Sequence, residues 1–453
     1  MRRFVNFLAK MYGKSTEKQF HVSAEVAGLL EGIYNTLKAN EGSVAKIDDK
    51  LRKQIVDALG KAGETYRCSV YKGFSGNKKD ISAEDLQAFF AVVVKFIDQS
   101  IKENKMKNGM YHAYNTISFS ENGIKVSNLY EMLEGQVSVL SSGKLSPKEV
   151  VELLDAMRQS ALYRADQFSY TLYPNKRLPL FLEKNVIPEK DIKAIKVLDD
   201  MVAAGDTDIV TKDVKGLYHF NASFNNAEFL KKAMAKKSNI SAADQKAIDE
   251  LYEKIFNHQA FTGRSGTFYK YEGLGCIYWH MVSKLLLAIG ENIKWAVEQG
   301  ADAATIAKLK KHYADVQFGI GAHKTPAQYG SFPFDAYSHT PTMAGVQQPG
   351  MTGQVKEDII NRFFELGLIV KDGALTIQST MLDKKDFVGG KKLSFTSCSI
   401  KFEYVIDGKE GIEIAYAKKT EKVAGYTLSR EQSQLIFNRD KSVKQVTVHF
   451  KSL

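Results

Sequence analysis

Cysteine is scarce in this chain. Its three cysteines, Cys68, Cys276 and Cys398, stand far apart in a sequence of 453 residues. An isolated and odd-numbered set offers neither a disulfide framework nor paired metal-ligand spacing, and it suits a reducing, cytoplasmic compartment. His323 and His339 also lack the spacing of metal ligands. The sequence therefore predicts no disulfide, no metal and no cofactor.

Long apolar runs and fixed repeats are also missing. No stretch of about 18 apolar residues occurs, so the sequence predicts no membrane span. The start, MRRFVNFLAKMYG, has an apolar core shorter than a signal peptide needs and no small-residue cleavage site after it, so we expect a helix there. The absence of a repeat of fixed period disfavours a scaffold of stacked helical hairpins.

A basic tail is absent too, although the formal net charge is +11. Lysines are interspersed with acidic residues, as in residues 40–53, which is typical of a solvated lysine surface. We therefore expect no nucleic-acid partner. An apolar content of 44% and a charged content of 25% are those of a soluble globular protein.

Helical spacing dominates residues 1–368. Ser82 and Ser146 predict helix N-caps, the second followed by Pro147 at the first helical position. From Ile277 onward, apolar residues fill every side of a 3.6-residue period, which indicates a buried helix, followed by separate helices over 291–300 and 302–313. Paired helices alternate with long loops rich in aromatic and polar residues. This organisation predicts a toroid of helical hairpins with the loops gathered at one end.

From residue 369 the period changes from 3.6 to 2. Asp372-Gly373 predicts a hairpin turn, and the segments that follow alternate or are rich in β-branched residues, including 433–438. The sequence therefore predicts five to seven antiparallel strands that form a β-sandwich over residues 369–453.

Three loop-to-helix junctions collect residues that hydrogen-bond sugars or anions. The first pairs Asp166 with Arg164, and the second runs from Arg264 through Tyr271 and Glu272 to His280. The third includes Gln347, Gln348, Thr352 and Gly353, and an aromatic loop contributes His112. A carboxylate, an imidazole and a guanidinium near a buried helix start are rarely placed there unless they are paired or used. The free N–H groups of such a helix start also favour an anion.

The second and third junctions resemble a known family. The segment Glu272-Gly-Leu-Gly-Cys-Ile-Tyr-Trp-His280 is similar to the Glu-Asn-Gly-Gly-Ile-Phe-Cys-His segment of the cellobiose and chitobiose phosphorylases, and Met351-Thr352-Gly353 is similar to their Leu-Thr-Gly step. The resemblance implies an inverting enzyme with an (α/α)₆ toroid over residues 1–368, in which His280 and Thr352 bind phosphate. By order along the chain, it implies Asp166 as the general acid. The family's N-terminal β-sandwich has no counterpart, so the chain is a shortened relative or part of a longer protein.

The chemistry of these residues is consistent with glycoside phosphorolysis. An acid must protonate the leaving oxygen, and phosphate is itself the nucleophile, so it needs a cationic pocket such as Arg264, His280 and Thr352. We therefore expect an oligosaccharide substrate, inorganic phosphate as co-substrate, and a homodimer or association with a missing N-terminal portion. In a hydrolase Glu272 would serve as base.

Several alternatives stay open at this point. Asp166 could simply pair with Arg164 or Arg177, and Arg264 could pair with Glu272. His280 could be a satisfied core histidine, and Thr352 could act only as an N-cap. A non-catalytic sugar-binding relative of the same fold is the competing function.

Overall fold

A computed structural model describes residues 1–175, 179–257, 277–320, 325, 339–340 and 355–453. The chain forms two compact units, one of Met1–Tyr173 with Cys276–Leu453 and one of Pro174–Gly275. The two units are divided at residues 173–174 and 275–276. The predicted domain division after residue 368 stays a prediction. No described helix is both long enough and apolar enough to cross a membrane.

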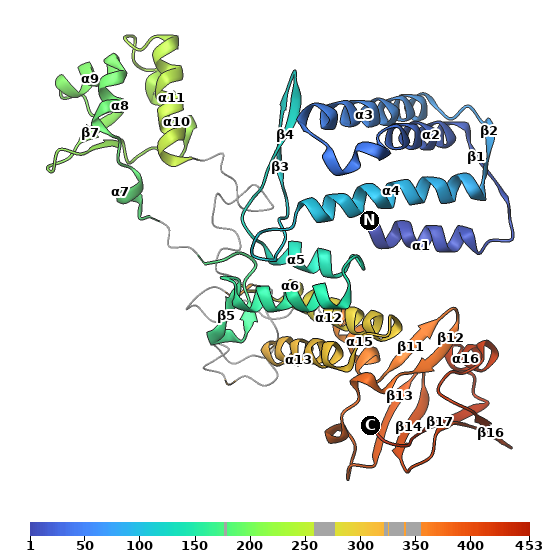
Figure 1. Ribbon diagram of the computed structural model, residues 1–453. Helices are drawn as coiled ribbons and strands as arrows, with labels where there is room; N and C mark the ends of the chain where they lie inside the picture. Colours follow the sequence, from blue (N-terminus) through green and yellow to red (C-terminus); the bar gives the residue numbers. More distant parts are fainter. Residues whose placement is uncertain (176–178, 258–276, 321–324, 326–338, 341–354) are drawn as a thin grey trace. The chain divides into compact units, whose positions relative to one another are not determined.

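The first unit begins with a helical bundle that has its own small core around Val5, Ala27 and Phe90. Helix α1 packs on α4 and α2 packs on α3, as Figure 1 shows, while β1 and β2 pair antiparallel. Ser82 caps α4 as predicted, because its side chain accepts a hydrogen bond from the Asp85 amide at 3.0 Å. The elements are α1 (Arg2–Gly13), β1 (Gln19–Ser23), α2 (Ala24–Ala39), the 3₁₀ helix η1 (Glu41–Lys46), α3 (Asp49–Lys72), β2 (Lys78–Ser82), α4 (Ala83–Glu103) and the hairpin β3 (Thr116–Ser120) with β4 (Gly123–Ser127).

A second core of this unit surrounds α12 (Trp279–Glu298). The prediction of a buried helix after Ile277 is confirmed, since Val282, Leu285 and Ile289 are fully covered. The predicted separate helix at 291–300 is wrong, because α12 continues through Gly290, which lies against Phe364. The elements around α12 are α5 (Leu133–Leu140), α6 (Pro147–Gln159), β5 (Tyr163–Arg164), η2 (Ala165–Gln167), β6 (Ser169–Tyr170), β9 (Ile277–Tyr278), α13 (Ala303–Gly319), β10 (His339–Thr340) and α15 (Val355–Glu365).

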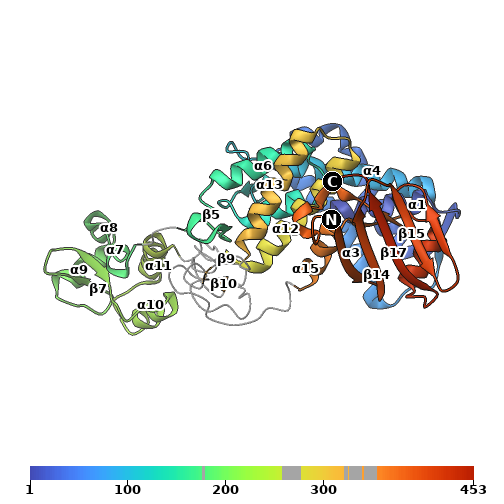
Figure 2. The same ribbon diagram turned by 90° about the horizontal axis from the view of Figure 1, so that it is seen from below.

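The C-terminal part of the unit contains a five-stranded mixed sheet and a separate two-stranded hairpin, rather than the predicted antiparallel sandwich. The strand order of the mixed sheet is β13-β14-β17-β15-β16, and β14 and β17 run parallel (Figure 2). The predicted turn at Asp372-Gly373 is confirmed, with positive φ at both residues between β11 and β12. The elements are β11 (Leu368–Lys371), β12 (Ala374–Ile377), η4 (Ser379–Met381), η5 (Lys384–Asp386), β13 (Lys392–Ser397), β14 (Ile400–Ile406), β15 (Gly411–Tyr416), β16 (Thr420–Val423), α16 (Arg430–Phe437) and β17 (Val443–Phe450).

Helix α16 replaces the strand that the sequence predicts at 433–438. Ser429 and Gln432 form a reciprocal capping box at its start, which satisfies two helix N–H groups. The helix lies between β16 and β17 along the chain, so β17 returns to the sheet beside β14 in the parallel direction. Crossover connections of this kind are how parallel neighbours arise, and an all-antiparallel prediction misses them.

Helices predominate before residue 368, but the described residues do not confirm a six-hairpin toroid. The N-terminal bundle and the helices around α12 have separate cores. Helices α5, α6, α13 and α15 all contact α12 directly. The capping prediction for α6 is confirmed, since Ser146 and Glu149 form a capping box with Pro147 at the first helical position.

The second unit is a small helical domain with a short β-ribbon. Its core includes Ile192, Phe220, Leu230 and Ile248. The buried side chain of Asn185 exchanges hydrogen bonds with the backbone of Phe220 at 2.8 and 2.9 Å, which fixes the ribbon to the start of the domain. The elements are α7 (Phe181–Lys184), α8 (Glu189–Ala194), α9 (Lys196–Ala203), β7 (Val210–Lys212), β8 (Tyr218–Phe220), α10 (Ala227–Met234) and α11 (Ala242–Phe256).

Candidate functional site

Four of the predicted site residues, His280, His112, Arg164 and Asp166, lie in the described part of the first unit. The other seven predicted site residues fall outside the described residues. They are Arg264, Tyr271, Glu272, Gln347, Gln348, Thr352 and Gly353. The geometry of the site is therefore built from the helices that the two sequence motifs lead into.

His280 is the second residue of α12, a helix in which most residues are buried. Strand β9 leads into this helix, pairs with β10 and contacts β6. The imidazole stands edge-on to Tyr278 at 5.3 Å between ring centroids. Its Nε2 atom is buried and has no hydrogen-bond partner. Burial lowers the pKa of His280, and the nearby charge of Lys284 lowers it further, which favours the neutral ring. A satisfied core histidine would not leave this nitrogen unpaired.

Further buried polar groups lie on α12 and on α15, two helices that pack together. Ser283 is 1% exposed, and its hydroxyl has no hydrogen-bond partner. On α15, Glu357 is 5% exposed with Oε2 unpartnered, and Asn361 is 3% exposed with both amide atoms unpartnered. Ser283 follows His280 by three residues and Asn361 follows Glu357 by four, so each pair shares a helix face. We call these four side chains the α12–α15 polar cluster.

Leaving such groups unpaired is costly. A buried polar atom without a partner costs about 1–3 kcal/mol, and most buried polar atoms in proteins are paired. Several on two helices that pack together indicate a place where another molecule supplies the missing hydrogen bonds. The imidazole, hydroxyl and carboxamide of the cluster can each donate a hydrogen bond to an oxyanion, whereas the Glu357 carboxylate can only accept one, for example from a sugar hydroxyl.

The charges around His280 favour an anion. Lys284 and Lys356 both lower its pKa, and Glu357 acts in the opposite direction. The first-turn N–H groups of α12 add a partial positive charge at the same end of the helix. An anion bound here would restore charge to the imidazole, because a negative neighbour raises the pKa of a histidine.

The hairpin of β5 and β6 holds the predicted acid. Arg164 donates two hydrogen bonds to the Asp166 carboxylate, at 3.0 and 2.7 Å. The Asp166 side chain is 61% exposed, while that of Arg164 is 14% exposed. These hydrogen bonds lower the pKa of Asp166, although partial burial opposes them. A general acid near neutral pH needs the opposite shift, so in the described state Asp166 is an ionised partner of Arg164.

His112 has a structural contact in its loop. Its Nδ1 lies 3.0 Å from the backbone carbonyl of Leu129. Two residues further on, the hydroxyl of Tyr114 donates to the carboxylate of Glu134, which is 5% exposed in the first turn of α5. The loop lies so close to α5 that a Cβ at position 135 would stand 2.7 Å from the Ala113 side chain. Through Tyr114, the loop therefore contacts a buried carboxylate in the first turn of α5, whereas His112 contacts only a backbone carbonyl in the described hydrogen bonds.

Residues 178–259 match GH149 phosphorylase insertion domain 2. The matched segment falls entirely within the second compact unit, and it spans well under half of the chain. The match supports a relationship to glycoside phosphorylases, while the specific likeness to the cellobiose and chitobiose phosphorylases goes beyond it. No curated protein matches this sequence.

The matched unit is itself built as a self-contained insertion. Its core comes from its own helices and ribbon, and the loop before β8 is closed by Asp213, which accepts hydrogen bonds from the backbone N–H groups of Lys215 and Leu217. His219 of β8 contacts the carboxylate of Asp213 at 3.1 Å, so its imidazole is paired within this unit.

Sequence reasoning missed Ser283, Glu357 and Asn361. Glu357 and Asn361 stand four residues apart in α15, so the spacing that places them on one face was visible. It could not show that this face is the buried one, because both faces of α15 carry apolar residues, including the exposed Ile359, Ile360 and Phe363.

Proposed function

We propose that this chain is a glycoside phosphorylase, alone or together with a further portion that completes it. The observation that carries the proposal is the match of residues 178–259 to a phosphorylase insertion domain. The α12–α15 polar cluster supports it independently, because it supplies the kind of anion site that this reaction needs. The substrate class is a neutral oligosaccharide, with inorganic phosphate as co-substrate.

In this reaction the glycosidic C–O bond breaks, and phosphate forms a new C–O bond on the opposite face of the sugar ring. The leaving oxygen takes a proton from an acid. His280, flanked by Lys284 and Lys356, holds the phosphate and shields its charge as it approaches the sugar carbon. Among residues outside the described part, Arg264 and Thr352 complete the anion pocket in this proposal.

Asp166 remains the first candidate for the acid, by its order along the chain. In the described state Arg164 keeps it ionised, so it can donate a proton only after substrate binding separates the pair. Glu272 is the second candidate, and the buried Glu134 with its tyrosine partner is the third.

The decisive experiment measures the release of sugar 1-phosphate. The protein is incubated with a panel of β-linked glucose disaccharides and longer oligosaccharides, with and without phosphate. We expect sugar 1-phosphate to form in proportion to added phosphate and almost no cleavage without it. Equal cleavage in phosphate-free buffer would instead identify a hydrolase, with Glu272 as the base.

A pair of histidine variants tests the location of the site. His280→Gln removes the imidazole and should raise the KM for phosphate or abolish product. His21→Gln is the matched control, because His21 is exposed and pairs with Asp80 on the N-terminal ribbon. Equal activity of both variants would move the phosphate site away from α12.

A second candidate function is a sugar-binding relative without catalysis. The observation that favours it is the ion pair that holds Asp166 ionised. Saturable oligosaccharide binding without turnover, under any phosphate concentration, would support this reading over the phosphorylase.

A further inference from the structure

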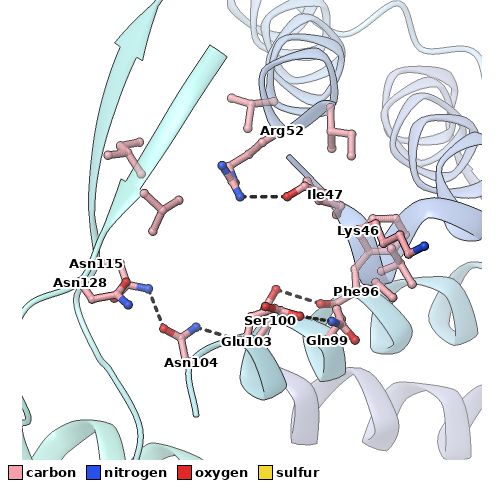
Figure 3. A pocket seen from close by; sticks show the side chains of 16 residues that line it. Lys46, Ile47, Arg52, Phe96, Gln99, Ser100, Glu103, Asn104, Asn115 and Asn128 are labelled. Atoms are coloured by element: carbon pink, nitrogen blue, oxygen red, sulfur yellow. Dashed lines mark hydrogen bonds between the residues drawn. The ribbon is translucent and has the colours of Figure 1, made fainter. Parts of the chain in front are cut away.

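The N-terminal part of the first unit contains a pocket that the proposed phosphorolysis does not use. Its volume is about 770 Å³, within the range of about 300–1,000 Å³ typical of small-molecule sites. It lies between η1, α3, α4 and the β3–β4 hairpin (Figure 3). Its lining combines apolar side chains with several carboxamides.

The hairpin is held over the pocket at both ends. Near its tip, Arg52 donates to the Ile124 carbonyl at 2.7 Å, and Gly123 lies so close to α3 that a Cβ there would be 3.0 Å from the Asp49 backbone. At its base, the Asn115 amide donates to the Asn104 side chain at 2.7 Å. Two fixed ends let the middle of the hairpin stand off from the helices, so the space beneath it is part of the built structure.

The polar part of the pocket lining includes the side-chain amides of Asn104 and Asn115. The Asn104 amide donates to the Ser100 carbonyl at 2.8 Å and its oxygen accepts from Asn115. The Oδ1 atom of Asn115 is buried and has no hydrogen-bond partner, so it lacks a donor. The guanidinium of Arg52 is engaged by Asp49 and by two backbone carbonyls. The lining also carries one exposed cation, Lys46, and one exposed anion, Glu103, so together with Asn115 it suits a neutral molecule that donates a hydrogen bond.

The apolar part of the lining comes from Ile55, Phe96, Ile117 and Val126. A pyranose ring combines an apolar C–H face with hydroxyls that both donate and accept, and carboxamides are well matched to such hydroxyls. A charged ligand would gain little from this lining, because Arg52 is paired with Asp49 and the other two charged side chains, Lys46 and Glu103, are of opposite sign.

We propose that this pocket is a second carbohydrate site, which binds a neutral hexose unit or a short oligosaccharide away from the phosphate site. This second proposal rests on the proposed function only in the choice of a glucose oligosaccharide as the ligand. In the bound state a sugar hydroxyl donates to Oδ1 of Asn115, and the ring lies against the apolar part of the lining.

The test uses calorimetry with a graded series of glucose oligosaccharides in phosphate-free buffer. Ile117→Trp fills the pocket from a strand position that is already 54% exposed, so folding should tolerate it. Ser118→Trp is the matched control, because the next residue of the same strand points to the opposite face. We expect binding by the native protein and the control, and at least about tenfold weaker binding by Ile117→Trp. Asn115→Leu should weaken binding about three- to tenfold, the usual range for one hydrogen bond.

Binding that is unchanged by Ile117→Trp would overturn the pocket assignment, as would the absence of binding to every sugar of the series. Preferential binding of glucose 1-phosphate at this pocket would overturn its neutral character. The outcome is separable from the proposed function. If phosphorolysis fails but Ile117→Trp still removes sugar binding, the pocket stands without the enzyme. If phosphorolysis is intact and no Ile117-sensitive binding exists, the enzyme stands without the pocket.

Discussion

Ser283 offers the sharpest test of whether the α12–α15 polar cluster is a ligand site. Its hydroxyl is buried without a partner, which costs about 1–3 kcal/mol in the ligand-free protein. Ser283→Ala removes that cost, and alanine is also the better helix former by about 0.5 kcal/mol. We therefore expect the substitution to raise the free energy of unfolding by about 1–3 kcal/mol, although most core substitutions lower it.

Ser433 provides the matched control. It is also fully buried in a helix of the same unit, but its hydroxyl donates to the Ser429 carbonyl at 2.7 Å and accepts from the Leu375 amide at 2.9 Å. Ser433→Ala removes both hydrogen bonds and leaves a buried N–H group unpaired. It should lower the free energy of unfolding by about 1–3 kcal/mol.

Urea unfolding followed by tryptophan fluorescence suits this comparison. The chain has two tryptophans, and both Trp279 and Trp295 lie in α12. Phosphate at about 100 times its Kd should stabilise the native protein by about 2.7 kcal/mol and the Ser283→Ala variant by less. Loss of stability in Ser283→Ala comparable to that in Ser433→Ala would refute the reasoning, because it would show that the Ser283 hydroxyl is already satisfied.

Three further predictions concern other residues. Asp166→Asn should lower turnover by about 10²–10⁴-fold and change stability by less than about 1 kcal/mol, because the replaced carboxylate is 61% exposed and asparagine keeps its shape. A stable variant with full turnover would pass the acid role to another carboxylate. The pKa of His280 is lower in the folded than in the unfolded state, so as pH falls below about 6.5 the unfolded chain takes up the proton first and the free energy of unfolding decreases. His280→Gln should flatten this pH dependence in unfolding measured from pH 8 to pH 5. Gly135→Ala should destabilise the protein by about 1–3 kcal/mol, because its Cβ would lie 2.7 Å from that of Ala113. Gly60→Ala, at an open position in the middle of α3, should stabilise it by about 0.5–1 kcal/mol. A shift of the thermal melting temperature in the same direction for both variants would contradict the close packing at Gly135.

Short-range features of the chain were set by the sequence alone. The caps at Ser82 and Ser146, the turn at Asp372-Gly373 and the burial of the helix after Ile277 each depend on residues within a few positions of one another. The wrong strand prediction at residues 433–438 also concerned a local feature. A short apolar run suits a strand or a helix, and the Ser429–Gln432 capping box, which is visible in the sequence, decides for the helix.

The sheet and the polar cluster depended on contacts between distant segments. No local pattern shows that β17 returns beside β14 in parallel, because that pairing joins strands separated by two other strands and a helix. The competition between burial and pairing at Asp166 was equally undecided by the sequence. It was the tertiary structure that left the carboxylate exposed and covered Arg164, so the arginine governs its pKa. In the same way, His280 was a visible candidate, but its meeting with Glu357 required two helices far apart in the chain to pack together, and only the folded core brings them within reach.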